Sequence, residues 1–279
     1  MEIGAHLDHV ELLSPAPRAC ALFYGRTYAM SLAESGGASA ARAPGRRLLF
    51  REGPANHIGY AAYAFDDRET LERHRERVAS RAGIGACPSP VFGDGAFSAT
   101  DPDGNRVVFG VTVAAEPFAA DSSASAIPPA RLQHLAVRSR DPAALLSFYR
   151  DALGFVVSDR VVDPKGILRA CFLRTDREHH SLAIFGASEV RHDHLSFETR
   201  DWSAVRDWAD RVSGLGVPMV WGIGRHGPGN DTFFMVRDPD GNLAEISAEL
   251  ETCAPERPEG VWPHAERTLN LWGGAIMRS

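Results

Sequence analysis

One short sequence occurs twice in this chain, and it divides the chain into two halves with the same layout. Asp-Pro-Asp-Gly-Asn stands at Asp101–Asn105 and again at Asp238–Asn242. In each copy the proline fixes its own φ and the glycine accepts a positive φ, which is typical of a tight turn. The chain of 279 residues is long enough for two modest modules, so the recurrence predicts one folding unit written twice.

Histidines keep the same spacing to this turn in the two halves. Val108 follows His57 by 51 residues, and Glu245 follows His194 by 51 residues. This register makes His57 the predicted counterpart of His194 and sets Val108 against Glu245. Because valine offers no ligand atom and glutamate offers a carboxylate, only the second half retains a metal-binding residue at this position.

A second pair of histidines opens the two halves. His9 and His134 each stand 15 residues before the tyrosine of a Phe-Tyr pair. The second half can therefore supply two imidazoles and one carboxylate to a single ion, and we predict His134, His194 and Glu245 to be its ligands. His9 and His57 are predicted to be hydrogen-bonded residues without a metal, because their half lacks the carboxylate.

His192 is an alternative to His194 as a ligand. The two residues are two positions apart on one predicted strand, and strand alternation places both side chains on the same face. The register between the halves favours His194, because only His194 lies 51 residues before the glutamate.

The pattern of apolar and turn residues predicts the order β-α-β-β-β written twice in each half. The predicted fold class is α+β, with residues 1–112 as a first module without metal and residues 131–248 as a second module with the metal site. Residues 113–130 are rich in Ala, Ser and Pro, which is typical of a linker. Residues 249–279 form a predicted C-terminal tail, whose two tryptophans suggest that it docks onto the second module or covers the mouth of its funnel.

Composition excludes several classes of protein. A formal net charge of −6 provides no general attraction to nucleic acid or to an anionic membrane. The four cysteines are scattered without a Cys-x-x-Cys pair, which argues against a disulfide framework and a structural zinc site. No apolar run approaches the 18 residues of a membrane-spanning helix, so we expect a soluble cytoplasmic protein.

The duplicated arrangement resembles the vicinal oxygen chelate superfamily, whose fold is also called the glyoxalase/bleomycin-resistance/dioxygenase fold. The resemblance is strongest to its two-domain extradiol ring-cleavage dioxygenases and covers nearly the whole chain. It implies two cup-shaped mixed sheets built from tandem βαβββ modules, with Fe(II) held only by the second module. It also implies that the ligands are His134, His194 and Glu245, and that the protein is a homo-oligomer.

The ligand set agrees with that chemistry on physical grounds. Two imidazoles and one carboxylate leave open positions on an octahedral metal, as in non-haem Fe(II) oxygenases. A catechol-like substrate would take two of these positions and O₂ the third, so that the metal brings the two reactants together. Mn(II) would satisfy the same ligands.

The resemblance also assigns residues around the metal. His180, in the sequence Glu-His-His-Ser, is expected to act as an acid/base near neutral pH, and His226 is expected to donate a hydrogen bond to the substrate. Asn230 and Asp231 are expected to shape the same substrate-facing wall. For each position the alternative is an ordinary solvated histidine or a glycine-rich loop.

One position departs from the family pattern. Family dioxygenases usually carry a tyrosine three residues before the turn aspartate, and this chain has Met235 there. Methionine packs against a ring but relays no proton, so the substitution favours slower ring cleavage, a substrate that is bound differently, or another reaction. Candidate wall residues, with a core position as the alternative, are Phe172, Trp221 and Phe234.

Three functions therefore follow from the sequence. The first is an Fe(II)-dependent extradiol dioxygenase that opens a catechol-type ring. The second is a metal-dependent enzyme of the same superfamily with another reaction, such as an isomerase, a lyase or an oxygenase that does not cleave the ring. The third is a resistance or binding protein that holds an aromatic ligand, and the complete ligand set argues against it.

Overall fold

The computed structural model describes residues 2–113 and 127–278, and the predicted linker at 113–130 lies almost wholly outside these residues. The first module contains two β-α-β-β-β units in succession. Its elements are β1 (Ala5–Ser14), α1 (Pro17–Thr27), β2 (Ser31–Ser35), β3 (Ala38–Ala43), β4 (Arg46–Glu52), β5 (His57–Phe65), α2 (Arg68–Ala79), β6 (Gly85–Ala86), β7 (Phe97–Thr100) and β8 (Arg106–Gly110).

The second module repeats this order and adds a docked C-terminal segment. Its elements are β9 (Ala130–Ser139), α3 (Pro142–Ser147), the π-helix η2 (Phe148–Ala152), β10 (Val156–Val162), β11 (Leu168–Arg174), β12 (Leu182–Gly186), β13 (Arg191–Thr199), α4 (Trp202–Gly214), β14 (Met219–Arg225), β15 (Thr232–Arg237), β16 (Leu243–Ala248), β17 (Gly260–Pro263) and α5 (Glu266–Leu269).

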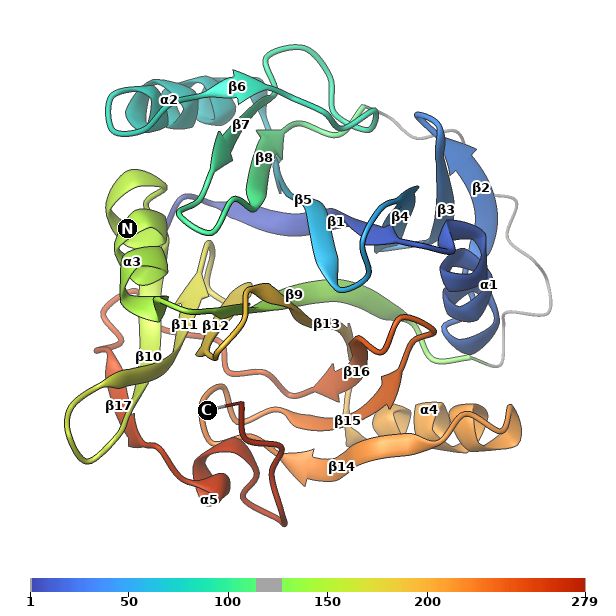
Figure 1. Cartoon of the computed structure of the whole chain (residues 1–279). Coiled ribbons are helices and arrows are strands. Elements are labelled where there is room, and N and C mark those ends of the chain that lie inside the picture. The colour runs from blue at the N-terminus through green and yellow to red at the C-terminus, as the bar shows by residue number, and fades with distance from the viewer. Residues whose placement is uncertain (1, 114–126, 279) are drawn as a thin grey trace.

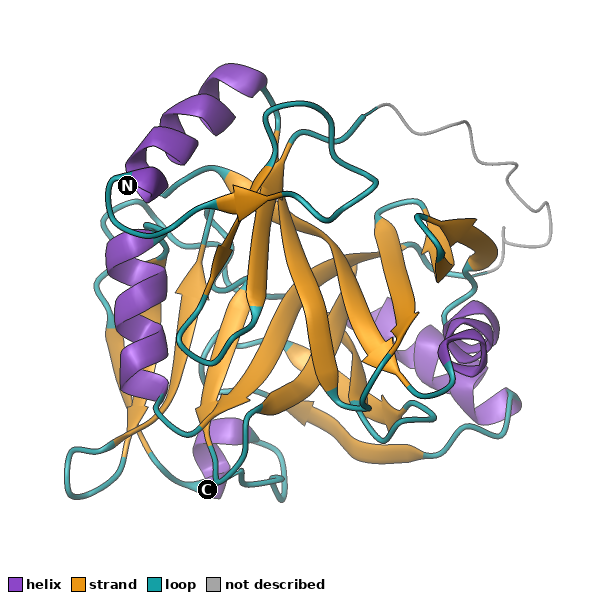
Figure 2. Ribbon diagram, turned by 45° about the horizontal axis from the view of Figure 1, so that its top comes forward, coloured by secondary structure: helices purple, strands orange, loops and turns teal. Residues whose placement is uncertain are grey.

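Each module forms one curved sheet of mixed strand direction, and the predicted α+β fold class is confirmed. The strand order is β2-β3-β4-β1-β5-β8-β7-β6 in the first sheet and β14-β15-β16-β13-β9-β12-β11-β10-β17 in the second. In both sheets the first strands of the two units, β1 with β5 and β9 with β13, pair at the centre. The two sheets pack face to face, with the helices at the ends of the pair (Figures 1 and 2).

The repeated tyrosine of each module forms a hydrogen bond with the repeated turn aspartate of the other module. The Tyr24 hydroxyl of α1 donates to the turn carboxylate of Asp238 at 3.3 Å, and the Tyr149 hydroxyl donates to Asp101 at 3.1 Å. Each aspartate also accepts backbone N–H groups of its own turn, at 2.8–3.0 Å. The recurring tyrosine and the recurring turn are therefore the two halves of one reciprocal contact between the sheets.

Some elements differ from the sequence-based expectation. The first helix of the second module begins after Asp141, whose side chain caps it, and widens into a π-helix from Phe148. Strands β2 and β3 are rich in Ser and Ala and contain no β-branched residue, so their sequences give no local signal for a strand. In the described parts of the chain no helix is long and apolar enough to cross a membrane.

A buried histidine in the first module makes stability depend on pH. His74 of α2 is 5% exposed, lies among the rings of Phe65, Phe97 and Phe109, and has no hydrogen-bond partner at Nε2. Burial, assisted by the charge of Arg77, lowers the pKa of His74 from 6.5 to about 4. Between these values the unfolded chain binds a proton that the folded protein excludes, so His74 destabilises the fold as pH falls through this window.

Replacing His74 with leucine is expected to remove this dependence. The wild-type free energy of unfolding should fall between pH 7 and pH 5 by about 2 kcal/mol more than that of His74→Leu. Urea unfolding of both proteins at the two pH values measures the difference. An equal loss of stability in the two proteins would contradict the assignment of this effect to His74.

Candidate metal centre

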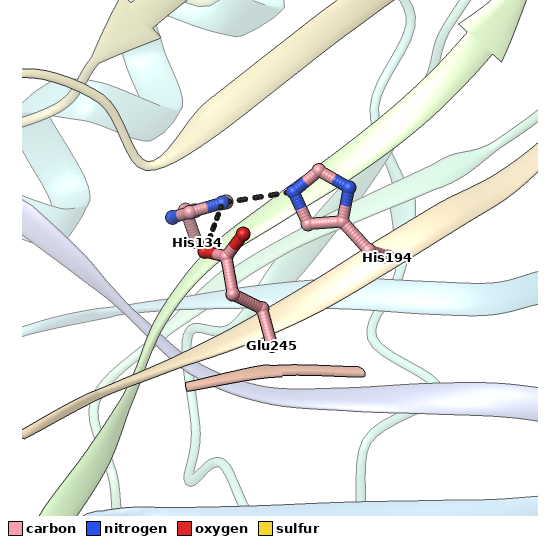
Figure 3. A group of neighbouring side chains, drawn as sticks. All are labelled: His134, His194 and Glu245. Atoms are coloured by element: carbon pink, nitrogen blue, oxygen red, sulfur yellow. Dashed lines mark hydrogen bonds and ion pairs between the residues drawn. The ribbon is translucent and has the colours of Figure 1, made fainter. Parts of the chain in front are cut away.

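Three neighbouring strands bring the predicted ligands together. Ser196 of β13 pairs with His134 of β9 on one side and with Glu245 of β16 on the other. His194 lies two residues before Ser196 and therefore projects from the same face of the sheet. The three side chains converge inside the cup of the second module, and their ligand atoms all lie within 4.8 Å of one another (Figure 3).

The three groups are buried and close. His134 Nε2 lies 3.0 Å from His194 Nε2 and 3.7 Å from Glu245 Oε1. Two nitrogens at adjacent octahedral positions, with bonds of about 2.1 Å to a metal, would lie about 3.0 Å apart. The arrangement of the two imidazoles thus has the spacing of adjacent ligands.

Residues next to the histidines set their tautomers. His134 Nδ1 lies 2.6 Å from Gln133 Oε1, and His194 Nδ1 lies 2.7 Å from Asp193 Oδ1. Because an amide oxygen and a carboxylate only accept, both Nδ1 atoms carry the proton and both Nε2 atoms present lone pairs. Outer partners of this kind orient the histidine ligands of metal sites.

The donor set fits a divalent cation. Two Nε2 lone pairs face each other without a hydrogen between them, and Glu245 Oε1 is buried without a hydrogen-bond partner. A bound cation would satisfy all three atoms at once. Burial lowers the pKa of His134 to about 3, so this imidazole is neutral, the form in which it binds a metal.

Glu245 is held as a carboxylate despite its burial. Burial by itself favours the protonated acid, but the hydrogen bond from His226 and the nearby histidines outweigh it and lower the pKa of Glu245. His192, the alternative to His194, does not join the cluster. A register shift separates it from His194, and both of its ring nitrogens are buried without a partner.

A pocket opens over the metal-binding atoms and contains most of the predicted substrate-facing residues. Phe172, His180, Trp221, His226 and Met235 all line it, together with the ligands His134 and His194.

Three predicted wall residues do not line this pocket. Phe234 lies on the opposite face of β15 from Met235 and packs in the core between the two sheets, so its predicted place in the wall is wrong. Asn230 is exposed, with a φ of 58°. Asp231 is fully buried beside the pocket, and its carboxylate lies within 4.8 Å of the ligand atoms of His226 and Glu245.

His180 is connected to a buried carboxylate through its neighbour. His179 Nε2 lies 3.1 Å from Asp159 Oδ2, and His179 Nδ1 lies 3.0 Å from His180 Nδ1. A proton on Nε2 of His179, on the side of this carboxylate, would make Nδ1 of His179 an acceptor for Nδ1–H of His180. This arrangement leaves Nε2 of His180 as its basic nitrogen.

The charge state of His180 differs from the sequence-based expectation. Burial, reinforced by four neighbouring imidazoles, holds the pKa of His180 well below its usual value of 6.5. His180 is therefore a neutral base at neutral pH instead of a group in mid-titration. The sequence suggested an ordinary imidazole because the burial of this strand start was not evident from it.

His226 has the opposite character. Its Nδ1–H donates to the Leu269 carbonyl at 2.5 Å, and its Nε2 lies 3.5 Å from Glu245 Oε2. Burial acts against the charged ring, but the carboxylates of Asp231 and Glu245 outweigh it and raise the pKa of His226. The pocket thus pairs a neutral base, His180, with a hydrogen-bond donor, His226.

The sequence did not reveal every residue of the site. Phe185, Leu269 and Arg278 also line the pocket, and the last two come from the C-terminal segment. That segment has no hydrophobic period that would point to the pocket. A signal did exist for Gln133 and Asp193, since each is a polar residue directly before a predicted histidine ligand in an apolar strand.

Among the residues that the structure describes, the first module has no equivalent ligand set. His9 is buried, with Nδ1 2.5 Å from Asp8 Oδ1 and Nε2 2.6 Å from Ser89 Oγ. Ala62 of β5 is the counterpart of Ser196 of β13. Ala62 pairs with His9 and Val108, in the same way as Ser196 pairs with His134 and Glu245.

The counterpart of His194 is therefore Tyr60, two residues before Ala62, and the predicted counterpart His57 is wrong. His57 is exposed at the start of β5, with Nδ1 2.8 Å from the Ala55 carbonyl. The counterpart of Glu245 is Val108, as the sequence indicated.

Comparison with known proteins agrees with this geometry. Residues 131–246 match the family model of the Glyoxalase/Bleomycin resistance protein/Dioxygenase superfamily. This match covers nearly all of the second module. The predicted resemblance to it, and to its two-domain extradiol dioxygenases, is confirmed.

Proteins similar to this chain include a metapyrocatechase and a dihydroxybiphenyl dioxygenase. It is 28% identical to metapyrocatechase 2 of Cupriavidus necator over 247 residues, which are 80% of this chain and 74% of the relative. It is 28% identical over 133 residues to the manganese-dependent 2,3-dihydroxybiphenyl 1,2-dioxygenase of Geobacillus genomosp. 3, covering 47% of this chain and 40% of the relative.

Solved structures share the fold of both modules. The Mn(II)-bound glyoxalase from Novosphingobium aromaticivorans has a TM-score of 0.79 at 23% identity, over 99% of this chain and 93% of that one. The complex of homoprotocatechuate 2,3-dioxygenase from Brevibacterium fuscum with 3,4-dihydroxyphenylacetate has a TM-score of 0.81 at 20% identity, over 98% and 89% of the chains.

Proposed function

We propose that this protein is an Fe(II)-dependent extradiol dioxygenase that adds O₂ to a catechol-type substrate and opens its ring. The first module would hold no metal, and the second would hold it through His134, His194 and Glu245. The observation that carries the proposal is the convergence of two Nε2 lone pairs and an unpartnered carboxylate oxygen on one point of the pocket. The names of the relatives support the reaction class.

An iron ion at these ligands would supply adjacent open positions for the two substrate oxygens and O₂, and a path for electrons between them. The residues around it have separate tasks. His180 accepts the proton of a substrate hydroxyl at Nε2, and the chain through His179 to Asp159 holds the ring in the tautomer that can do so. His226, which also lines the pocket, donates a hydrogen bond to a substrate oxygen.

Apart from Arg278, whose guanidinium is paired with Asp193, apolar side chains form the rest of the pocket and exclude water from the reacting ring. Phe172, Trp221 and Leu269 offer no charged group to the substrate. A neutral catechol with an apolar substituent is therefore the substrate class that this wall favours. Incubation of anaerobically reconstituted Fe(II) protein with 2,3-dihydroxybiphenyl in air should produce the yellow ring-opened product. Stoichiometrically bound iron without a coloured product from any catechol would contradict the proposal.

Met235 offers a gain-of-function prediction. It is fully buried, lines the pocket and pairs in register with Glu245, so Met235→Tyr would bring a phenol to the metal-binding face. A positioned donor is worth a few kcal/mol of transition-state stabilisation, and we expect kcat for ring cleavage to rise about 10- to 100-fold.

The matched control is Met235→Phe, which adds the same ring without a hydroxyl. Steady-state kinetics of the three proteins should show the gain for tyrosine alone, with phenylalanine no faster than methionine. An equal gain in both variants would show that ring packing, and not proton donation, limits the wild-type rate.

A second candidate function rests on a different observation. Asp231 places an additional buried carboxylate without hydrogen-bond partners next to His226 and Glu245. A metal enzyme that moves protons without O₂, such as an isomerase, would use such a carboxylate as a base. Metal-dependent turnover of a substrate without O₂ consumption would favour this candidate over ring cleavage.

A further inference from the structure

The last described residues of the chain run back across the metal pocket. After α5 the backbone is tied down at Gly274, whose carbonyl accepts from Trp221 Nε1 at 3.0 Å and from Asn270 Nδ2 at 2.9 Å. Ala275, Ile276 and Met277 then pack against the apolar cluster that surrounds the pocket. The chain end marked C in Figure 1 accordingly lies against the second module.

This segment delivers one guanidinium to the pocket. The Arg278 side chain is 2% exposed and donates to both carboxylate oxygens of Asp193, at 2.7 and 3.1 Å. Its guanidinium carbon lies 4.7 Å from the ring centre of Phe185 and 5.0 Å from that of Trp221. Bidentate pairing and stacking on aromatic rings together fix the orientation of an arginine closely.

The partner of Arg278 is the carboxylate that orients a predicted metal ligand. Asp193 is fully buried and accepts the Nδ1 proton of His194 at 2.7 Å. Arg138 of β9 also donates to it, through a single bond of 2.6 Å from a side chain that is 22% exposed. A buried carboxylate needs compensating charge, and removal of one partner is costly in such a site.

We propose that Arg278 is a positioning residue for the metal centre, and this inference rests on the proposed function. Through Asp193 it holds His194 in the tautomer and orientation that direct Nε2 at the metal. Arg138 compensates part of the Asp193 charge from the sheet, whereas Arg278 fixes both oxygens from the pocket side. Metal binding is thereby coupled to the docked position of the segment from Gly274 to Arg278, in which Arg278 contacts Asp193.

Metal affinity tests the proposal without any assay of turnover. Arg278→Met retains an unbranched apolar stem but removes the guanidinium. Loss of the direct partner of a metal ligand weakens binding about 10- to 100-fold. Arg278 acts on His194 through that partner, Asp193, so we expect the dissociation constant for Mn(II), measured by calorimetry, to rise about 10-fold. The matched control is Arg267→Met. Arg267 is an exposed arginine of the preceding helix α5, and this variant should bind Mn(II) like the wild type.

The outcomes separate this inference from the proposed function. Wild-type protein that binds no Mn(II) would overturn the metal site itself and this inference with it. Tight binding by wild type and Arg278→Met alike would overturn the role of Arg278 and leave the metal site standing.

A measurement on the wild-type protein alone guards against a misfolded variant. Coupling between metal binding and docking of residues 274–278 is reciprocal. If docking of this segment raises the affinity for Mn(II) by a given factor, saturating Mn(II) must stabilise the docked segment by the same factor. We expect amide hydrogen exchange of residues 274–278 to slow about 10-fold or more when Mn(II) is added. Exchange that does not change with Mn(II) would contradict the proposed coupling.

Discussion

Replacing Glu245 with glutamine is expected to abolish metal binding and to lower ring-cleavage turnover by at least about 1000-fold. The amide cannot supply an anionic oxygen, and the ion would lose one of its three protein ligands. Metal content by atomic absorption and kcat with a catechol, measured on protein reconstituted with Fe(II), check the two effects together.

Glu69→Gln is the control for this experiment. Glu69 is exposed on α2 of the first module, where its side chain pairs only with Arg73 of the same helix. This variant should match the wild type in metal content and rate. Undiminished metal binding and turnover in Glu245→Gln would show that Glu245 is not a ligand.

Replacing His180 with asparagine is expected to lower kcat by about 100- to 10,000-fold while leaving the metal content unchanged. The size of the effect is that of a lost general acid/base. Metal content should persist because His180 lies beside the ligands without joining the group of three. Steady-state kinetics and metal analysis of the same preparation make the test.

His57→Asn is the control, since His57 is an exposed histidine of the first module. The His57→Asn variant should have the kcat and the metal content of the wild type. Loss of metal from His180→Asn would assign His180 to the ligands, and retention of the wild-type kcat would remove it from the reaction.

Much of the fold could be predicted because its landmarks are local. The Asp-Pro-Asp-Gly-Asn turn and the Phe-Tyr pair are recognised from a few neighbouring residues. Their purpose was hidden, because the Tyr24–Asp238 and Tyr149–Asp101 bonds join residues of different modules. No local pattern reports such a contact.

The structure brings the three predicted ligands together, although the reasoning that selected them was partly wrong. Equal spacing aligned His57 with His194, yet strand pairing makes Tyr60 the counterpart. Tyr60 precedes Val108 by 48 residues and His194 precedes Glu245 by 51, so the connecting segments of the modules differ by three residues. The number of residues between two positions changes with the length of the loops between them. The pairing register of the strands does not depend on loop length, so it identifies the true counterparts.

Other parts of the site show where sequence information ends. Strand alternation could have excluded Phe234, because it must point away from a pocket that contains Met235. No such rule was available for Leu269 and Arg278, which reach the pocket through an irregular segment that docks by tertiary contacts alone.

The most direct test of ring cleavage at this metal centre is the stoichiometry of O₂ uptake. The protein, reconstituted with Fe(II) without air, should consume one O₂ for each catechol that disappears, with no effect of added catalase on the oxygen trace. Catechol conversion without O₂ uptake, or uptake that catalase partly returns as O₂ from hydrogen peroxide, would contradict an extradiol dioxygenase.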